Sequence, residues 1–208
     1  MKTDEQKLAV LNKLVAHYGE QHWWEDENWV RDGVSMILIQ QSTQENVEKA
    51  LANLAPVMSL QGLRKLSVDE LQEQIRPAGF YKQKAAYLQN WLAFFAKYGD
   101  EPTAYNRFAT PELREMLLSI KGVGAETADC MLMYLFQRKT FIADAYALRL
   151  FARLGFGEYE NYPSMRNDFQ HLTDHVTLKQ CKEWHACIDV HGKRFRKGLV
   201  SEESFLLE

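Results

Sequence analysis

Apolar residues recur every three or four positions along most of this chain, and that spacing restricts the fold more than any other feature of the sequence. Near the start it runs through Leu8, Leu11, Leu14, Val15 and Tyr18, which would share one face of a helix. The apolar–polar alternation of a half-buried strand is nearly absent. The 11 glycines and 5 prolines are few for 208 residues, which argues against a turn-dense β-sandwich or barrel.

We therefore expect an all-α protein with about nine or ten helices. Beyond the first, helix periodicity returns through Val34, Ile37, Leu38, Val47, Leu51 and Leu54, and further helical signals span 68–75, 83–98, 111–120, 125–136, 145–154 and 162 to about 195.

The composition is that of a globular protein. Hydrophobic residues make up 46% and charged residues 25% of the chain, which excludes intrinsic disorder, a collagen-like repeat and a coiled-coil rod. The longest apolar runs, around 36–39 and 131–136, are too short to cross a membrane. Residues 1–10 lack the basic and then apolar pattern of an export signal. We expect a cytoplasmic protein that does not contact membranes.

Charge and cysteine content exclude further classes. A net charge of −3 is not the wholly basic surface that marks many nucleic-acid-binding proteins, so any DNA contact has to be local. The three cysteines, Cys130, Cys181 and Cys187, are odd in number and lack a CxxC spacing, which argues against a disulfide framework or a tetrahedral zinc site. Buried free thiols are the expectation.

The segment Leu117–Ala128, LLSIKGVGAETA, is the most informative part of the sequence. Gly122 and Gly124 lie between an apolar helix end and an apolar helix start, a pattern that permits a tight turn with outward amides able to hold a phosphate. An ordinary helix–turn–helix corner that needs glycine only for packing is the alternative. The flanking Ile120, Val123 and Thr127 match the helix-hairpin-helix motif, which binds a DNA backbone through main-chain nitrogens. The expected backbone contacts are Lys121, Gly122, Val123, Gly124, Glu126 and Thr127, with Lys82 and Lys84 as further phosphate contacts.

Three other segments extend this pattern into a family resemblance. The hairpin is followed by Phe141–Tyr146, FIADAY, and preceded by Gln40–Thr43, QQST, and Gly79–Ala85, GFYKQKA. Together they resemble the helix-hairpin-helix DNA glycosylases related to endonuclease III, from about Trp23 to Lys193. The nearest branch resembles the cluster-free 3-methyladenine DNA glycosylases of the endonuclease III type, on the evidence of Trp23-Trp24, Arg76–Tyr81 and His191-Gly192-Lys193.

The resemblance implies a two-lobed all-α fold with its active site in the cleft between the lobes. One lobe would be a central bundle of residues 29–133 that carries the hairpin, and the other would combine 1–28 with 134–208. Asp144 is the expected catalytic carboxylate, which would stabilise the positive charge that develops on the sugar as the base departs. The alternative is that Asp144 only caps the helix that begins at Ala145, and both roles can coexist.

Two departures from the better-known members of the family bear on the reaction. Where the bifunctional glycosylase/lyases have a lysine after the hairpin, this chain has Glu126, and a carboxylate cannot form a Schiff base. The resemblance then implies a monofunctional enzyme that uses water, unless another lysine replaces the missing amine. The four-cysteine loop of the family is also absent, so we expect no iron–sulfur cluster.

The resemblance also assigns roles in extruding and binding the damaged base. Gln41 is the expected plug for the vacated stack, with Phe80 and Tyr81 as a second wedge; core packing is the alternative for these two aromatic residues. The expected base pocket contains Trp23, Trp24, Tyr146 and Lys193. Lys193 lies in the basic run His191–Lys197, which would otherwise be a solvated helix face, and this lysine can position Asp144 or itself be modified.

These inferences predict a monomeric, monofunctional DNA glycosylase that acts on damaged double-stranded DNA, associated with the nucleoid if the source is bacterial. Alkylated purines such as 3-methyladenine are the first substrate class, because they carry positive charge and suit aromatic stacking. A bifunctional glycosylase/lyase on oxidised pyrimidines and a non-catalytic DNA-binding protein remain the alternatives. No side chain demands a metal, although hairpin carbonyls can hold a monovalent cation.

Overall fold

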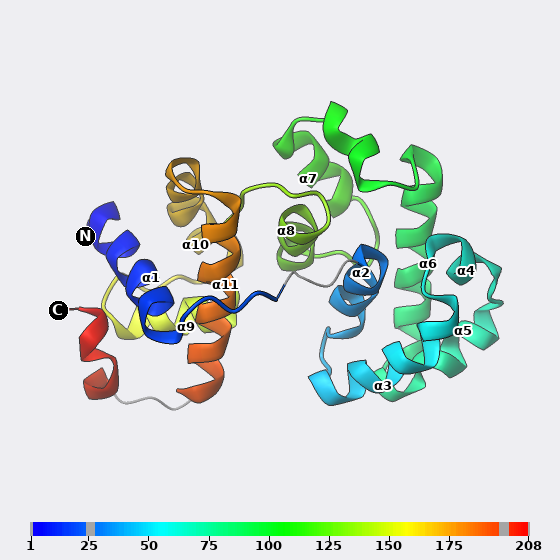
Figure 1. The fold of residues 1–208 in the computed structure, drawn as a ribbon, viewed down its shortest axis with the longest axis horizontal. Coiled ribbons are helices and arrows are strands. Elements are labelled where there is room, and N and C mark those ends of the chain that lie inside the picture. Colours follow the sequence, from blue (N-terminus) through cyan, green and yellow to red (C-terminus); the bar gives the residue numbers. More distant parts are fainter. Residues whose placement is uncertain (1, 24–27, 196–199, 208) are drawn as a thin grey trace. The chain divides into compact units, whose positions relative to one another are not determined.

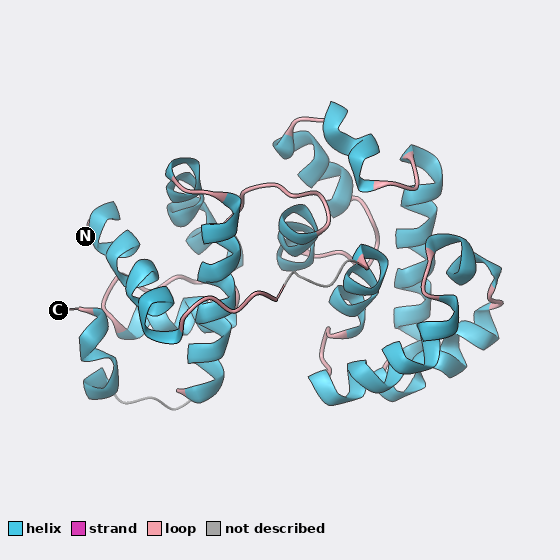
Figure 2. Cartoon of the chain, in the orientation of Figure 1, coloured by secondary structure: helices cyan, strands magenta, loops and turns pink. Residues whose placement is uncertain are grey.

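The computed structural model describes residues 2–23, 28–195 and 200–207, which form helices and loops with no strand among them (Figures 1 and 2). The expected all-α class is confirmed. No helix within these described ranges is long and apolar enough to span a membrane. The chain divides into two compact units, which we call the hairpin unit, Asp26–Phe136, and the terminal unit, Met1–Glu25 with Gln137–Glu208. The sequence predicts divisions after residues 28 and 133.

The hairpin unit packs its helices around a cluster of aromatic side chains. Trp91, Phe95 and Tyr105 are fully buried there. Gly33 lets its helix pack closely against the helix that carries Trp91, because a Cβ at Gly33 would lie 2.3 Å from the Trp91 ring. Its α-helices are α2 (Trp29–Leu38), α3 (Gln44–Leu54), α4 (Leu60–Lys65), α5 (Val68–Ile75), α6 (Tyr81–Tyr98), α7 (Thr110–Leu118) and α8 (Ala125–Tyr134); short 3₁₀ turns are η1 (Ala55–Val57), η2 (Arg76–Ala78) and η3 (Pro102–Arg107).

The terminal unit joins both ends of the chain in a second core. Phe151, Phe169 and Trp184 are its largest buried side chains. The long helix α11 packs against both α1 and α9, which brings segments far apart in the sequence side by side (Figure 1). Its elements are α1 (Asp4–Tyr18), α9 (Ala145–Arg153), α10 (Tyr162–Phe169), η4 (Gln170–His175), α11 (Leu178–Arg194) and η5 (Val200–Leu206).

The helical signal predicted from 162 to about 195 is divided in the structure into three elements, α10, η4 and α11. The break has a local cause, because Thr177 starts α11 with a capping box in which it and Gln180 satisfy each other's backbone amides. With this break, the described ranges contain eleven α-helices, slightly more than expected.

Candidate active site and DNA-binding hairpin

The turn between α7 and α8 needs glycine at one of its two glycine positions. Gly122 has φ 103°, a left-handed conformation that favours glycine, and a Cβ there would lie 2.2 Å from the Tyr87 ring. Gly124 has φ −88°, and a Cβ on it would meet nothing within 4 Å. The packing explanation therefore holds for Gly122 and not for Gly124.

Gly124 is the N-cap residue of α8, and no side chain caps this helix start. The first amides of a helix have no partner within the helix, so an uncapped start offers donors and a positive dipole end to an anion. Lys121 and Glu126 are exposed beside it, Gly122 and Thr127 are half-buried, and Val123 is buried. The side chain of Val123 supports the turn from inside, which leaves its main chain as its only means of contacting DNA.

Two amide side chains hold the hairpin in shape, and sequence reasoning missed both. Gln40 Nε2 donates to the Gly122 carbonyl at 3.0 Å and to Thr127 Oγ1 at 3.3 Å. Asn90 Nδ2 donates to the Lys121 carbonyl at 3.0 Å. The only available signal was the position of Gln40 in the QQST segment, which says nothing about its partner 82 residues away.

The predicted plug and one predicted wedge residue lie at two similar turns. Gln41 and Phe80 have φ 51° and 48°, values that cost non-glycine residues free energy and often mark functional positions. Both side chains are exposed, Phe80 by 61%. Together with Lys84 and Tyr87 they line one pocket of about 90 Å³. The structure thus brings Gln41 and Phe80 together.

Tyr81 differs from its neighbour Phe80. Its ring is half-buried against the core of the hairpin unit, and the Arg76 guanidinium lies 4.9 Å from its centroid. The core-packing alternative describes Tyr81 better than the wedge does.

The predicted phosphate contact of Lys84 is wrong. Lys84 is 2% exposed, and its ammonium donates to the carbonyls of Leu38 at 2.7 Å and Ala78 at 2.8 Å. Burial lowers the pKa of Lys84. Leu38 and Ala78 precede the turns at Gln41 and Phe80, respectively. The buried Lys84 ammonium therefore joins the two turns by a hydrogen bond to each. Lys82 and Lys121 are exposed and stay predicted phosphate contacts.

Asp144 is the N-cap of α9, and its Oδ1 accepts a hydrogen bond from the Ala147 amide at 2.8 Å. The carboxylate is held still by this bond and is 8% exposed. Burial raises its pKa to about 6, with a smaller contribution from the negative charge of Asp189, while the Ala147 amide opposes the shift. The capping role predicted as the alternative is therefore real, and the pKa leaves the group mostly ionised at neutral pH.

Helix α11 supplies the surroundings of Asp144 and Tyr146. Gly192 lies against the Tyr146 ring, where a Cβ would come within 2.1 Å. One turn earlier Asp189 forms an ion pair with Lys193, 2.6 Å from Nζ to Oδ2, and the Lys193 side chain is 60% exposed. Sequence reasoning missed Asp189, because its relation to Asp144 depends on how α9 packs against α11.

Trp23 is the described member of the predicted tryptophan pair. Its ring is 44% exposed and lies edge-on to His185, 6.0 Å between centroids. The Lys193 ammonium is 5.8 Å from the Trp23 centroid. Burial lowers the pKa of His185 to about 4, which makes this imidazole neutral at physiological pH. Trp24 lies outside the described residues.

The cysteines do not fit an iron–sulfur cluster. The chain has three cysteines, and such a cluster takes four thiolate ligands. Burial raises the pKa of Cys181 to about 11 and that of Cys187 to about 12, so both favour the thiol form over the ligating thiolate.

Comparison with known proteins agrees with this arrangement. The model of the HhH-GPD superfamily of base excision DNA repair proteins matches residues 34–175. A Methanocaldococcus jannaschii protein named "Putative DNA repair glycosylase MJ1434" is 42% identical over 200 residues, 92% of this chain and 90% of that protein. Endonuclease III of Buchnera aphidicola subsp. Baizongia pistaciae is 27% identical over 162 residues, covering 77% and 70% of the two chains.

Among solved structures, H. pylori 3-methyladenine DNA glycosylase bound to 1,N6-ethenoadenine superposes with a TM-score of 0.71 at 24% identity, over 92% of this chain and 96% of that one. The fold is therefore shared. The chain belongs to the HhH-GPD superfamily of base excision DNA repair proteins and is a DNA glycosylase.

Proposed function

We propose that this glycosylase is monofunctional and hydrolyses the N-glycosidic bond of an alkylated purine in double-stranded DNA. The observation that carries the proposal is the Asp144 carboxylate, which is buried and fixed by the Ala147 amide. At the position of the lyase lysine stands Glu126, which has no amine to attack the sugar.

Asp144 would act on the sugar. As the base leaves, the anomeric carbon gains positive charge, and a preorganised carboxylate in a buried setting stabilises that charge strongly. The same group can orient or deprotonate the attacking water. Only the ionised form does either, so the raised pKa of Asp144 sets the lower pH limit of the reaction.

The hairpin unit would hold and open the DNA. The uncapped start of α8 would bind a backbone phosphate through main-chain amides, with Lys121 and Lys82 beside the strand. Gln41 and Phe80, exposed at adjacent turns, would fill the space of the extruded nucleoside. A monovalent cation at the hairpin would have to share carbonyls, because those of Lys121 and Gly122 already accept amide hydrogen bonds.

Trp23 would stack on the extruded base. A cationic methylated purine is attracted to an indole face, and Asp189 neutralises the Lys193 ammonium that would otherwise repel such a base. We expect Trp23→Ala to lose excision of methylated purine while binding of abasic DNA persists. Equal loss of both would contradict a base-stacking role.

The test is incubation of the purified protein, which we propose acts as a monomer, with a panel of duplexes that carry alkylated purines or oxidised pyrimidines. We expect release of the alkylated purine with an intact strand and no borohydride-trapped complex. Release of oxidised pyrimidines with borohydride trapping would support the glycosylase/lyase alternative instead. Lys193 would then be the first lysine to substitute in the search for the reacting amine.

A further inference from the structure

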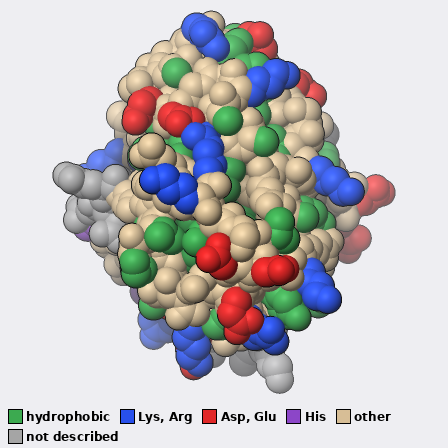
Figure 3. Space-filling view, turned by 90° about the vertical axis from the view of Figure 1, so that its right-hand side faces the viewer, with side chains coloured by type: hydrophobic (Ala, Val, Ile, Leu, Met, Phe, Trp, Pro, Cys, Tyr) green, Lys and Arg blue, Asp and Glu red, His purple; other side chains and the backbone are tan. Residues whose placement is uncertain are grey.

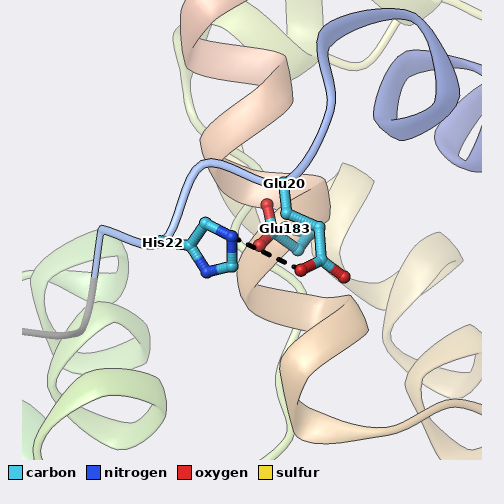
Figure 4. A group of neighbouring side chains, drawn as sticks. All are labelled: Glu20, His22 and Glu183. Atoms are coloured by element: carbon cyan, nitrogen blue, oxygen red, sulfur yellow. Dashed lines mark ion pairs between the residues drawn. The ribbon is translucent and has the colours of Figure 1, made fainter.

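Three side chains outside the proposed active-site chemistry converge on one point of the terminal unit. Glu20 and His22 belong to the segment that follows α1, and Glu183 belongs to α11. One ligand atom from each lies within 4.8 Å of the other two. Figure 4 shows the three side chains turned toward one another.

Glu183 gives this cluster a feature that ordinary surface acids lack. Its side chain is 2% exposed. Oε2 accepts a hydrogen bond from the Gln21 amide at 2.8 Å, but Oε1 is buried with no hydrogen-bond partner among the described residues. A buried carboxylate oxygen without a partner is costly, and in this setting a cation would satisfy it.

The spacing of the two exposed members is compatible with a shared metal ion. His22 Nε2 is 3.4 Å from Glu20 Oε2, which is long for a charge-assisted hydrogen bond. Metal–ligand bonds of about 2.1 Å at tetrahedral angles place neighbouring ligand atoms about 3.4 Å apart. One imidazole nitrogen with two carboxylate oxygens is a zinc donor set, with a fourth position left for water.

Lys179 is the competing cation at this point. Its ammonium lies 2.6 Å and 2.7 Å from the two Glu20 oxygens. The side chain is 54% exposed, so it can swing into solvent at little cost when an ion binds. Its positive charge would weaken metal affinity without blocking the site.

We propose that Glu20, His22 and Glu183 bind one divalent transition-metal ion, Zn²⁺ by donor set. The ion would fasten the segment after α1 to α11 and so fix Trp23, the residue directly after His22. This departs from the expectation that the chain holds no metal. It does not depend on which base the enzyme removes.

The experiment is calorimetric titration of Zn²⁺ into the chelator-treated full-length protein, repeated with Co²⁺ to record the visible absorption of a tetrahedral site. We expect one ion per chain. His22→Gln and Glu183→Gln should each weaken binding by about tenfold or more, and Lys179→Met should strengthen it. Glu183→Gln keeps an acceptor for the Gln21 amide, and melting in chelator shows whether each variant is folded.

The matched control is His171→Gln. His171 also pairs with an exposed carboxylate, Nε2 to Asp4 Oδ2 at 2.7 Å, and is 48% exposed, but no buried third ligand joins it within the part of the chain that the structure describes. Unchanged Zn²⁺ binding in this variant supports the proposed site. The proposal is overturned if the wild-type protein shows no saturable binding, if folded His22→Gln binds as the wild type does, or if His171→Gln loses as much as His22→Gln.

Discussion

At the scale of single residues, Asp144 combines two demands that oppose each other. The proposed catalysis needs its charge, whereas burial disfavours that charge and raises the pKa to about 6. The Ala147 amide supports the ionised form and fixes the carboxylate at the start of α9. A buried charged group of this kind lowers the stability of the folded protein, but it is already positioned for reaction.

Asp144→Asn should therefore stabilise the protein in a pH-dependent way. The folded pKa of Asp144 is about 6 and lies above the ordinary value of 3.8. Between these values the unfolded chain ionises first, so wild-type stability falls as pH rises from about 4 to about 6, by about 2–3 kcal/mol. Asparagine cannot ionise, and the variant should escape this loss.

Urea unfolding of both proteins at pH 4 and pH 7.5 measures the effect. The difference in free energy of unfolding, variant minus wild type, should be larger at pH 7.5. A difference that is equal at the two pH values would show that Asp144 is not destabilised by burial.

The hairpin glycines offer a matched pair of substitutions. Gly122→Ala introduces a Cβ at φ 103° within 2.2 Å of Tyr87, and should lower the free energy of unfolding by about 1–3 kcal/mol. Gly124→Ala introduces one at φ −88° in open space, and should change stability by less than about 1 kcal/mol. Thermal melting compares the stabilities of the two variants. An equal loss of stability would contradict the requirement for glycine at position 122 alone.

At the scale of elements, the helices could be predicted from sequence, but their mutual contacts could not. Apolar spacing is a local signal, so it located α1, α6 and α8. The break before α11 depends on a capping box at Thr177 that the apolar pattern does not reveal. The distinctive segment around Asp144 is enough to single out this carboxylate as a candidate from the sequence.

The supporting residues of the site could not be found in this way. Gln40, Asp189 and Lys84 act on partners brought to them by packing, and polar side chains are equally common on a solvated surface. Lys84 was misassigned for this reason, since nothing in GFYKQKA distinguishes the exposed Lys82 from the buried Lys84.

Lys84→Met tests the connection between the two turns. Methionine fills similar space but leaves the carbonyls of Leu38 and Ala78 without their donor. We expect a loss of about 2–4 kcal/mol in the free energy of unfolding, against less than about 0.5 kcal/mol for Lys82→Met on the exposed side of the same helix. Chemical denaturation measures both variants. If Lys84→Met has the same free energy of unfolding as the wild type, the buried ammonium is dispensable for stability.

At the scale of the whole molecule, the net charge gives no overall attraction for DNA. The net charge is −3, and on the face drawn in Figure 3 the described lysines and arginines are interspersed with acidic side chains. The proposed binding through main-chain amides at α8 would reconcile this charge with a DNA substrate, because amides and a helix dipole need no net positive surface.

The salt dependence of DNA binding should consequently be shallow. With Lys82 and Lys121 as the main phosphate-neutralising cations, the logarithm of the affinity should fall with the logarithm of salt concentration with a slope of about −2. Lys121→Ala should reduce the magnitude of that slope by about 1. Lys49→Ala, which removes a lysine paired with Glu45 on α3, is the control and should leave the slope unchanged.

The most direct measurement is the single-turnover rate of base release from a duplex containing a methylated purine, recorded from pH 5 to pH 8 for the wild type and Asp144→Asn. The wild-type rate should rise through pH of about 6 as the carboxylate ionises. The variant should bind the duplex with near-normal affinity and release base at least about 10³-fold more slowly at every pH. Release by Asp144→Asn at the wild-type rate would contradict the role assigned to this carboxylate.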